Sequence, residues 1–200
     1  PFQDSETAKN LLRAFAGESQ ARNRYDFAAN LCQKQELQAM SFIFQATAKQ
    51  EQAHAKVFWD HLQALNGQNL PIYGAYPIEG TNRVLELLRA AQHNEHEEHG
   101  SVYPSFAAIA TQEGFPEAAA SFRQIAAIEQ LHGERFGLLA DQLESGALFV
   151  SQIETGWMCL NCGHTQNSLE APKQCPVCNH SQGWFIRLEL APWSPVAKQT

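Results

Sequence analysis

The sequence lacks any run of about 18 uncharged apolar residues, the length that a membrane-spanning helix requires. Residues 1–6, PFQDSE, offer neither the basic segment nor the apolar segment of a signal peptide. No G-x-G-x-x-G motif occurs, so the chain is not expected to bind NAD(P)H directly. These absences predict a cytoplasmic protein without a membrane partner.

Positive charge is also in short supply. The 14 Lys and Arg residues are outnumbered by 21 Asp and Glu residues, and the net charge of −7 argues against a nucleic-acid partner. Aspartate is rare too, with 4 residues against 17 glutamates. Because Glu is a good helix former and Asp a poor one, this imbalance favours helices. The apolar fraction of 44% excludes a fully disordered chain.

Charge and cysteine divide the chain into two parts. Residues 1–146 hold 29 of the 35 charged side chains, whereas residues 147–200 hold only 6. Cysteine has the opposite distribution, because Cys32 stands alone and the other four lie between residues 159 and 178. We therefore predict two domains, 1–146 and 147–200, with a junction near Ser145 and Gly146.

Helical periodicity predicts four helices in the first domain, at about residues 5–32, 35–65, 81–113 and 115–145. Ser5 and Thr81 are expected N-caps, and Pro116 suits a first helical turn. Short links close each pair of helices into a hairpin, while residues 67–80 form a long connection between the pairs. Two hairpins joined by one long crossover are typical of a ferritin-like, all-α four-helix bundle. No period-two alternation predicts a strand in this domain.

Two of these helices carry the same pattern, Glu51-x-x-His54 and Glu129-x-x-His132. Residues three apart share one face of a helix, so each carboxylate and imidazole can hold one metal ion together. Di-iron bundles combine two such motifs with one Glu from each of the other two helices. A single motif of this kind is common on helix surfaces and indicates little by itself.

Glu18 and Glu95 supply the two further carboxylates. Glu95 follows Glu18 by 77 residues and Glu129 follows Glu51 by 78, so the two hairpins repeat nearly the same pattern. Each of these glutamates alone would be interpreted as a solvated surface residue. The joint pattern predicts a two-metal site inside the bundle.

The third helix offers more polar residues beside Glu95. Glu98 lies about 60° from Glu95 around the helix axis and His99 about 40°, which makes Glu98 a candidate seventh ligand and His99 a supporting residue. Tyr25 shares the face of Glu18, where it either bonds a ligand carboxylate or packs as a structural residue.

Other residues are interpreted as structural. Pro104 is expected to remove a backbone hydrogen bond and to bend the third helix near Gly100. The remaining candidates are assigned to surface or core packing: His61, His93, His96 and Cys32.

The second domain contains two Cys-x-x-Cys pairs separated by twelve residues, Cys159/Cys162 and Cys175/Cys178. This spacing predicts one tetrahedral metal ion held by four thiolates, and a disulfide pair is the less favoured interpretation. Zinc ribbons and iron rubredoxin centres share the spacing, so the metal stays open between iron and zinc. Aromatic residues nearby can build a small core, namely Trp157, Trp184 and Phe185.

Taken together, these motifs resemble the rubrerythrin family, which includes nigerythrin. The resemblance covers almost the whole chain and rests on residues 16–25 (AGESQARNRY), Glu51-x-x-His54, residues 95–99 (EHEEH), residues 103–106 (YPSF), Glu129-x-x-His132 and the four clustered cysteines. Two departures occur, because His164 and Asn179 stand where rubredoxin knuckles usually have an aromatic residue and a glycine. Neither departure removes a ligand.

The resemblance implies a non-haem di-iron peroxidase that reduces hydrogen peroxide to water. It implies two iron ions in the bundle, bridged by an oxo group and by Glu51 and Glu129. The implied terminal ligands are Glu18, Glu95, Glu98, His54 and His132, with Glu98 exchanged for His54 on reduction. It further implies one iron ion in the second domain, held by Cys159, Cys162, Cys175 and Cys178, which relays electrons to the bundle.

The electrons must come from outside the chain, from an NAD(P)H-dependent reductase or a small rubredoxin. The fourth helix continues about 17 residues past Glu129, or roughly 25 Å, so the chain's own tetrathiolate iron lies far from its own iron pair. Delivery from a partner subunit is the more plausible route, which predicts a homodimer or a larger homo-oligomer. The alternative function is ferritin-like iron binding or oxidation, with a structural zinc ion in the four-cysteine site.

Overall fold

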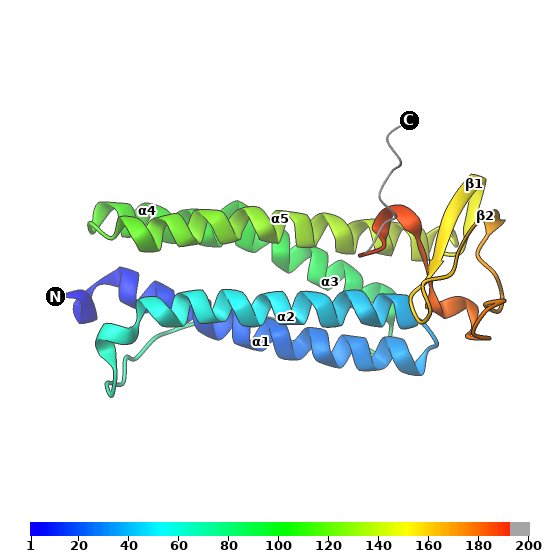
Figure 1. Cartoon of the computed structure of the whole chain (residues 1–200). Coiled ribbons are helices and arrows are strands. Elements are labelled where there is room, and N and C mark those ends of the chain that lie inside the picture. The colour runs from blue at the N-terminus through cyan, green and yellow to red at the C-terminus, as the bar shows by residue number, and fades with distance from the viewer. Residues whose placement is uncertain (193–200) are drawn as a thin grey trace.

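The computed structural model describes residues 1–192, in which long helices run side by side and a small sheet lies at one end (Figure 1). α1 packs along α2, and α5 packs along α3 and α4. The prediction of a four-helix bundle is confirmed, because α3 and α4 form one interrupted helix, and no strand occurs within residues 1–144. None of the described helices is both long and apolar enough to cross a membrane. The helices are α1 (Glu6–Lys34), α2 (Gln38–His61), α3 (Val84–Glu97), α4 (Tyr103–Gln112) and α5 (Pro116–Glu144).

The first hairpin begins at the predicted N-cap. The Ser5 side chain accepts a hydrogen bond from the Ala8 amide at 3.0 Å. Glu36 has a left-handed backbone conformation, with φ 58°, in the turn between α1 and α2. α2 ends earlier than predicted, because the amide of Leu62 bonds the carbonyl of Trp59 and tightens the last turn. A separate 3₁₀ turn follows, η2 (Gln63–Leu65).

The start of the third helix differs from the prediction. α3 begins at Val84 with Arg83 in the N-cap position, so the N-cap assignment of Thr81 was wrong. The hydroxyl of Thr81 instead accepts a hydrogen bond from the Arg83 amide at 3.2 Å. A Thr side chain that bonds the amide two residues ahead stabilises a turn, and here this turn precedes the helix.

A π-helical turn, η3 (Glu98–Val102), separates α3 from α4. Pro104 has no amide hydrogen with which to bond the carbonyl of Gly100, so the regular hydrogen-bond ladder is interrupted where the sequence predicted a bend. A π turn inserts one extra residue into a helix and often occurs at functional sites. The interruption begins at Glu98, directly after the turn that carries Glu95.

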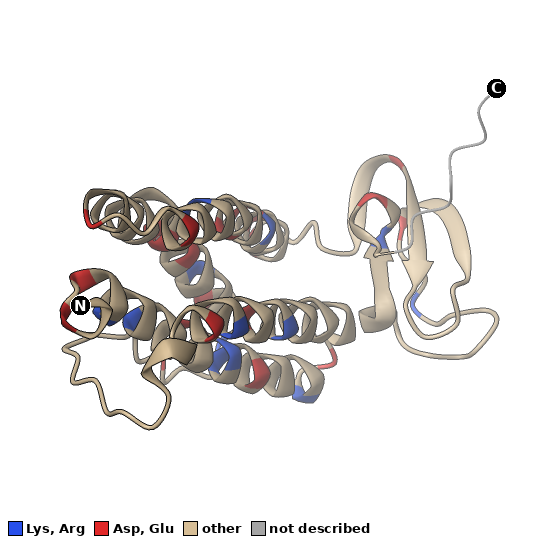
Figure 2. Ribbon diagram, turned by 60° about the vertical axis from the view of Figure 1, so that its left-hand side comes forward, with Lys and Arg blue, Asp and Glu red and all other residues tan. Residues whose placement is uncertain are grey.

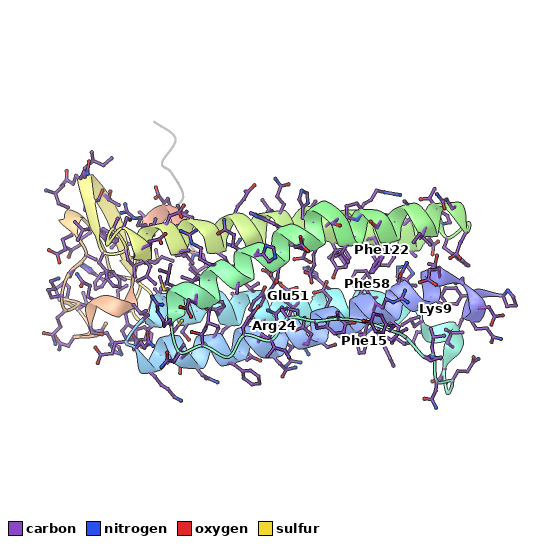
Figure 3. The ribbon with its side chains drawn as sticks, turned by 180° about the vertical axis from the view of Figure 1, so that it is seen from behind. Lys9, Phe15, Arg24, Glu51, Phe58 and Phe122 are labelled. Atoms are coloured by element: carbon purple, nitrogen blue, oxygen red, sulfur yellow. The ribbon has the colours of Figure 1, made fainter. Side chains whose placement is uncertain are left out.

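The apolar core of the bundle forms two clusters along its length. One cluster contains Tyr25, Phe44 and Phe136, and the other contains Phe58 and Phe122. The rings of Phe58 and Phe122 lie 5.1 Å apart between centroids, and Figure 3 shows them inside the bundle, with Glu51 farther along the interior. The buried glutamates and histidines of the bundle lie between the two apolar clusters.

The long crossover, residues 66–83, runs along the outside of the bundle beside α1 (Figure 3). The Tyr76 hydroxyl donates to the carbonyl of Arg13 at 2.8 Å, and the Arg13 side chain donates to the carbonyl of Tyr73 at 2.9 Å. Arg24 forms a salt bridge with Glu79 at 2.7 Å. These contacts fasten the crossover to α1 although it contains no helix or strand.

The C-terminal domain is a three-stranded antiparallel sheet in the order β2-β1-β3. Its core holds Trp157 and Phe185, and Trp184 packs against it, as the sequence predicted. Few charged residues lie in this domain, whereas both signs are spread along the bundle (Figure 2). The elements are β1 (Val150–Cys159), β2 (Thr165–Glu170), β3 (Phe185–Arg187) and the 3₁₀ turns η4 (Gln182–Trp184) and η5 (Leu188–Leu190).

This domain rests on the end of the bundle where α1 turns into α2. Ala39 of α2 packs in one apolar cluster with Met158 and Ile186 of the sheet. Gly183 lies so close to the turn that a Cβ atom there would be 1.7 Å from the carbonyl oxygen of Glu36. The two domains are therefore in direct contact through a small, tightly packed joint.

Candidate metal centres

Six buried side chains converge between the two apolar clusters of the bundle. Four helices supply them, and each is at most 6% exposed. Two groups form, and the members of each group have ligand atoms within 4.8 Å of one another. The first group is Glu18, Glu51, His54 and Glu129, and the second is Glu51, Glu95, Glu129 and His132.

The first group is arranged around the imidazole of His54. Its Nδ1 atom lies 2.9 Å from Oε1 of Glu129, 3.3 Å from Oε2 of Glu51 and 3.7 Å from Oε2 of Glu18. The spacing of Glu51 and His54 on α2 brings these two side chains to the same face.

The second group repeats this arrangement around His132. Its Nδ1 atom lies 2.8 Å from Oε2 of Glu129, 3.0 Å from Oε1 of Glu51 and 3.5 Å from Oε2 of Glu95. Its other nitrogen, Nε2, is 2.9 Å from Oε1 of Gln50, which orients the ring. Gln50 was not predicted from the sequence, because it is one position before a ligand candidate and belongs to no motif.

Glu51 and Glu129 belong to both groups. In each of them, one carboxylate oxygen faces His54 and the other faces His132. Two carboxylates placed in this way could each contact both members of a pair of metal ions. Glu18 and Glu95 each belong to only one group. The pseudo-symmetry follows from the near repeat of the two hairpins in the sequence.

The oxygen and nitrogen atoms of these side chains are better satisfied by bound metal ions than by hydrogen bonds to one another. Several of them are buried within ion-pair distance of a histidine but make no hydrogen bond of good geometry: Oε2 of Glu18, Oε1 of Glu51, Oε2 of Glu95, both oxygens of Glu129 and Nδ1 of His132. Burial of so many carboxylates is costly unless cations compensate them. Four carboxylates balance the charge of two ferrous ions, and this ligand set matches a di-iron site.

The pKa values of these buried glutamates and histidines also indicate that the site stabilises positive charge. Burial raises the pKa of Glu18 well above its usual range and that of Glu95 to about 8. Burial disfavours the charged form of His54, yet the facing carboxylates, Glu129 first, raise its pKa to about 12. Burial also disfavours the charged form of His132, but the carboxylates of Glu129 and Glu51 raise its pKa to about 11. The carboxylates thus stabilise cationic partners at this position.

Two tyrosines hold the terminal carboxylates. The Tyr25 hydroxyl donates to Oε1 of Glu95, which is one of the two roles expected for it, and its ring also packs on Phe44. The Tyr103 hydroxyl donates to Oε1 of Glu18. In both cases the other oxygen, Oε2, stays directed at the histidine. From the sequence, Tyr103 was noted only within residues 103–106, as part of the family resemblance, and no contact with Glu18 was predicted for it.

Glu98 is the predicted ligand that the structure does not bring into either group. It begins the π turn and lines a cavity next to the first group. Burial raises its pKa well above the usual range, and the nearby Glu95 carboxylate adds to the effect. His99, expected as a supporting residue, instead places Nδ1 2.8 Å from the carbonyl oxygen of Ala126 on α5.

Two of the histidines assigned to packing have local partners. Nε2 of His61 lies 2.9 Å from the hydroxyl of Ser121. His96 packs so tightly on α5 that a Cβ atom at Gly133 would be 2.4 Å from its ring. Cys32 is fully buried in the apolar core, and burial raises its thiol pKa to about 12.

The four cysteines of the C-terminal domain form the second centre. The sulfur atoms of Cys159 and Cys178 are 3.7 Å apart, and those of Cys162 and Cys175 are 3.6 Å apart. All four lie within 4.8 Å of one another, which suits a single tetrahedral ion.

Two similar turns position these sulfurs. Gly163 and Asn179 follow the two Cys-x-x-Cys pairs with φ of 77° and 61°, and their amides bond the carbonyls of Cys159 and Cys175 at 2.8 and 2.9 Å. Asn tolerates this left-handed conformation, so the departure at Asn179 keeps the turn. The backbone amide of His180 bonds the sulfur of Cys178 and lowers its pKa to about 5, which favours the thiolate.

The bundle with one long crossover, its shared carboxylates and the separate tetrathiolate turns define a class of protein, a ferritin-like di-iron protein fused to a rubredoxin-like domain. Within this class, the chain belongs to the rubrerythrin family. The family profile described as Rubrerythrin matches residues 9–140, and the profile described as Rubrerythrin, rubredoxin-like domain matches residues 157–186. The predicted family, fold and cofactor types are confirmed.

Individual relatives agree with this assignment. The chain is 44% identical to a rubrerythrin of Porphyromonas gingivalis over 92% of this chain and 90% of the relative. It is 43% identical to a rubrerythrin of Clostridium perfringens over 92% of this chain and 95% of the relative. A solved structure of nigerythrin in a mixed-valence state has the same fold, with a TM-score of 0.61 and 23% identity, and covers 92% of this chain and 90% of that one.

Proposed function

We propose that this chain is a peroxidase that reduces hydrogen peroxide to two water molecules, with two electrons relayed through the four-cysteine iron and two protons taken from solvent. The observation that carries the proposal is the pair of shared carboxylates, Glu51 and Glu129, in one chain with a tetrathiolate centre. A storage protein needs no such electron-accepting centre, whereas a peroxidase needs a continuous supply of electrons.

When bound, the iron pair supplies the two electrons that cleave the oxygen–oxygen bond. Glu51 and Glu129 would hold both ions, and His54, His132, Glu18 and Glu95 would supply the remaining protein ligands. Tyr25 and Tyr103 keep the terminal carboxylates in place by donating to one oxygen of each. These contacts limit the rearrangement of the site between its oxidation states.

Glu98 is proposed as the exchangeable ligand. Four carboxylates would balance two ferrous ions, so the reduced site would need only neutral His54 in addition. Glu98 would supply a fifth carboxylate to offset part of the extra charge of the oxidised pair. The position of Glu98 supports this role, because it begins a π turn, a feature frequent at functional sites, and lines the cavity next to the first group.

Electrons are proposed to come from an external NAD(P)H-dependent reductase or a rubredoxin, and to reach the bundle from the partner subunit of a homodimer or larger oligomer. α5 continues 15 residues past Glu129 to its end at Glu144, about 22 Å. The chain's own tetrathiolate centre lies beyond that end, where the second domain packs on the turn of α1 into α2. A second subunit can bring its own centre closer.

We also propose a domain boundary between residues 146 and 147 and a cytoplasmic location for the protein. The end of α5 at Glu144 and the start of β1 at Val150 support a boundary between residues 146 and 147, and residues 193–200 of the second domain lie outside the described residues. A tetrathiolate centre requires reduced cysteines, which supports a reducing compartment such as the cytoplasm.

A direct test is a coupled assay with the purified, iron-loaded protein, a reductase and NADH. We expect a red protein that consumes one NADH for each hydrogen peroxide. A colourless protein that contains zinc, ignores peroxide and oxidises ferrous ions with oxygen would contradict the proposal and support the ferritin-like alternative.

A further inference from the structure

A cavity of about 270 Å³ lies beside the first metal group, between α1, the crossover and the interrupted helix α3–α4. Its inner wall contains Glu98 and Tyr103, and Tyr103 donates its hydroxyl to Glu18 of the metal group. Its outer wall contains Gly17 of α1 and Tyr76 of the crossover. The cavity therefore connects the outside of the bundle to the edge of the proposed reaction site.

The cavity is larger than hydrogen peroxide requires. One water molecule needs only about 10–15 Å³ of such space, so a cavity of about 270 Å³ can hold a molecule much larger than water. Hydrogen peroxide has only two heavy atoms. The spare volume is enclosed in part by apolar groups, namely Ala14, Val102, Phe106 and the ring of Tyr76.

The charges at the mouth do not favour an anion. Two arginines line the cavity, and both are already paired: Arg24 with Glu79 at 2.7 Å and Arg13 with Glu6. Arg24 also donates to Gln20 at 2.6 Å. With Glu98 at the inner wall, the cavity suits a neutral molecule with an apolar body and one polar end.

We propose that this cavity binds small organic hydroperoxides, with the alkyl or aryl group against Tyr76, Phe106 and Val102 and the hydroperoxide group toward Glu98 and Tyr103. The inference rests on the proposed peroxidase function and extends its substrate class. The reaction is ROOH + 2 e⁻ + 2 H⁺ → ROH + H₂O. The oxygen–oxygen bond breaks, the electrons come from the same external reductase, and the protons come from solvent.

Gly17 allows the cavity to be filled by a single substitution. A Cβ atom at this position would lie 3.5 Å from the ring of Tyr76, an ordinary contact, so Gly17→Ala is tolerated. The longer side chain of Gly17→Leu extends into the cavity and also suits the interior of α1. Tyr76→Ala removes the opposite wall, Tyr76→Phe retains it, and Tyr73→Ala is a matched control on the same crossover, where Tyr73 is 85% exposed.

The first experiment measures binding without turnover. The probe is 2-phenyl-2-propanol, the alcohol product of cumene hydroperoxide, observed by NMR with the iron-loaded, reduced protein. Iron near the cavity should broaden the methyl signal of the bound alcohol. We expect Gly17→Leu to abolish the broadening, Tyr76→Ala to weaken it, and Gly17→Ala, Tyr76→Phe and Tyr73→Ala to leave it unchanged.

The second experiment compares kcat/KM for cumene hydroperoxide with kcat/KM for hydrogen peroxide. We expect Gly17→Leu to lower this ratio at least about tenfold, because a filled pocket discriminates by size. Tyr76→Ala should raise KM for cumene hydroperoxide, whereas the control Tyr73→Ala should leave the kinetics of both peroxides near the parental values. Iron content and the visible spectrum check that Glu18, next to Gly17, still binds metal.

The outcomes separate the two proposals. If the parent reduces neither peroxide, the proposed function fails, and the broadening experiment alone decides whether the cavity binds the alcohol. If the parent reduces hydrogen peroxide but the alcohol shows no broadening, or if Gly17→Leu and Tyr76→Ala both behave as the parent, the cavity is not a hydroperoxide site. Should Gly17→Leu fail to fold, the pair Tyr76→Ala and Tyr76→Phe decides.

Discussion

The two metal centres of this chain are built in opposite ways. The bundle site takes ligands from four helices, between Glu18 and His132, and buries all of them. The tetrathiolate site takes its ligands from two short turns between Cys159 and Cys178, and Cys162 is exposed. One site depends on long-range packing of the whole bundle, and the other on local backbone geometry. Each should therefore survive the loss of the other.

The largest expected effect is the loss of both bundle irons in Glu129→Ala. A shared carboxylate compensates two cations at once, so its removal weakens both positions. Metal analysis should show iron falling from about three to about one per chain, with the red tetrathiolate retained. Glu134→Ala, an exposed residue on the same helix, should keep the full complement. Two bundle irons still bound in Glu129→Ala would refute the bridging assignment.

The converse change, Cys162→Ser, should remove only the other centre. We expect the visible absorption of the tetrathiolate to disappear and reductase-coupled turnover to slow, while circular dichroism shows an intact bundle. Cys32→Ala, which changes the buried cysteine of the bundle, should keep the colour. If the Cys162→Ser protein still consumed peroxide at the parental rate with the same reductase, the relay role would be excluded.

Glu98→Ala is expected to change the metal content little but to lower the rate of peroxide turnover clearly. The protein should keep both bundle irons, because six other ligands remain, yet lose most peroxidase activity, about 100-fold if Glu98 exchanges with His54. Oxidation of ferrous iron by oxygen should be less affected. Both activities are measured on the same iron-replete sample, alongside Glu97→Ala, whose side chain is exposed. Near-parental peroxide turnover would leave Glu98 a supporting residue only.

The contact between the two regions can be broken by Gly183→Ala. Its new Cβ atom would meet the Glu36 carbonyl at 1.7 Å, so the domains must shift apart. We expect both centres to stay loaded and stability to fall by about 1–3 kcal/mol, as for other overpacked positions. Proteolysis between α5 and β1 reports the separation. Gly80→Ala, where a Cβ atom meets nothing within 4 Å, is the control.

The most gradual effect concerns pH in the metal-free protein. Glu95 has a folded pKa of about 8 against an ordinary value of 4.5, so its contribution to stability is full below 4.5 and is lost as pH rises to about 8. The contributions of His54 and His132, whose folded pKa values are about 12 and 11 against an ordinary 6.5, are full below 6.5 and are lost progressively as pH rises from there toward 11 and 12. The melting temperature of the metal-free protein should fall between pH 5 and 9. With iron bound it should change little, and a rise in the metal-free protein would contradict this account.

Several features of the fold could be read from sequence because they depend on near neighbours. The Ser5 side chain accepts a hydrogen bond from the amide three residues ahead. Pro104 lacks the amide hydrogen of a regular helix, and the helix is interrupted just before it. The Glu-x-x-His and Cys-x-x-Cys spacings likewise fix pairs of side chains within one turn. Thr81 was assigned wrongly although it is local, because a Thr side chain can bond a turn amide as well as a helix amide.

Other features could not be read in this way. Gln50 contacts a histidine 82 residues away in sequence, and Tyr103 contacts a glutamate 85 residues away. Neither carries a spacing signal, because no rule of helix periodicity relates positions on different helices. The cavity beside Glu98 also combines three separate segments of the chain.

The sequence by itself determined the helical bundle, the two classes of metal centre and six side chains that meet in the bundle, because periodicity and motif spacing act within single helices and turns. Only the tertiary structure decided which oxygens of Glu51 and Glu129 face which histidine, and that Glu98 lies outside the group. It also decided where the second domain rests on the first. These outcomes depend on how helices pack across the core, because periodicity and motif spacing within one helix do not relate positions on different helices.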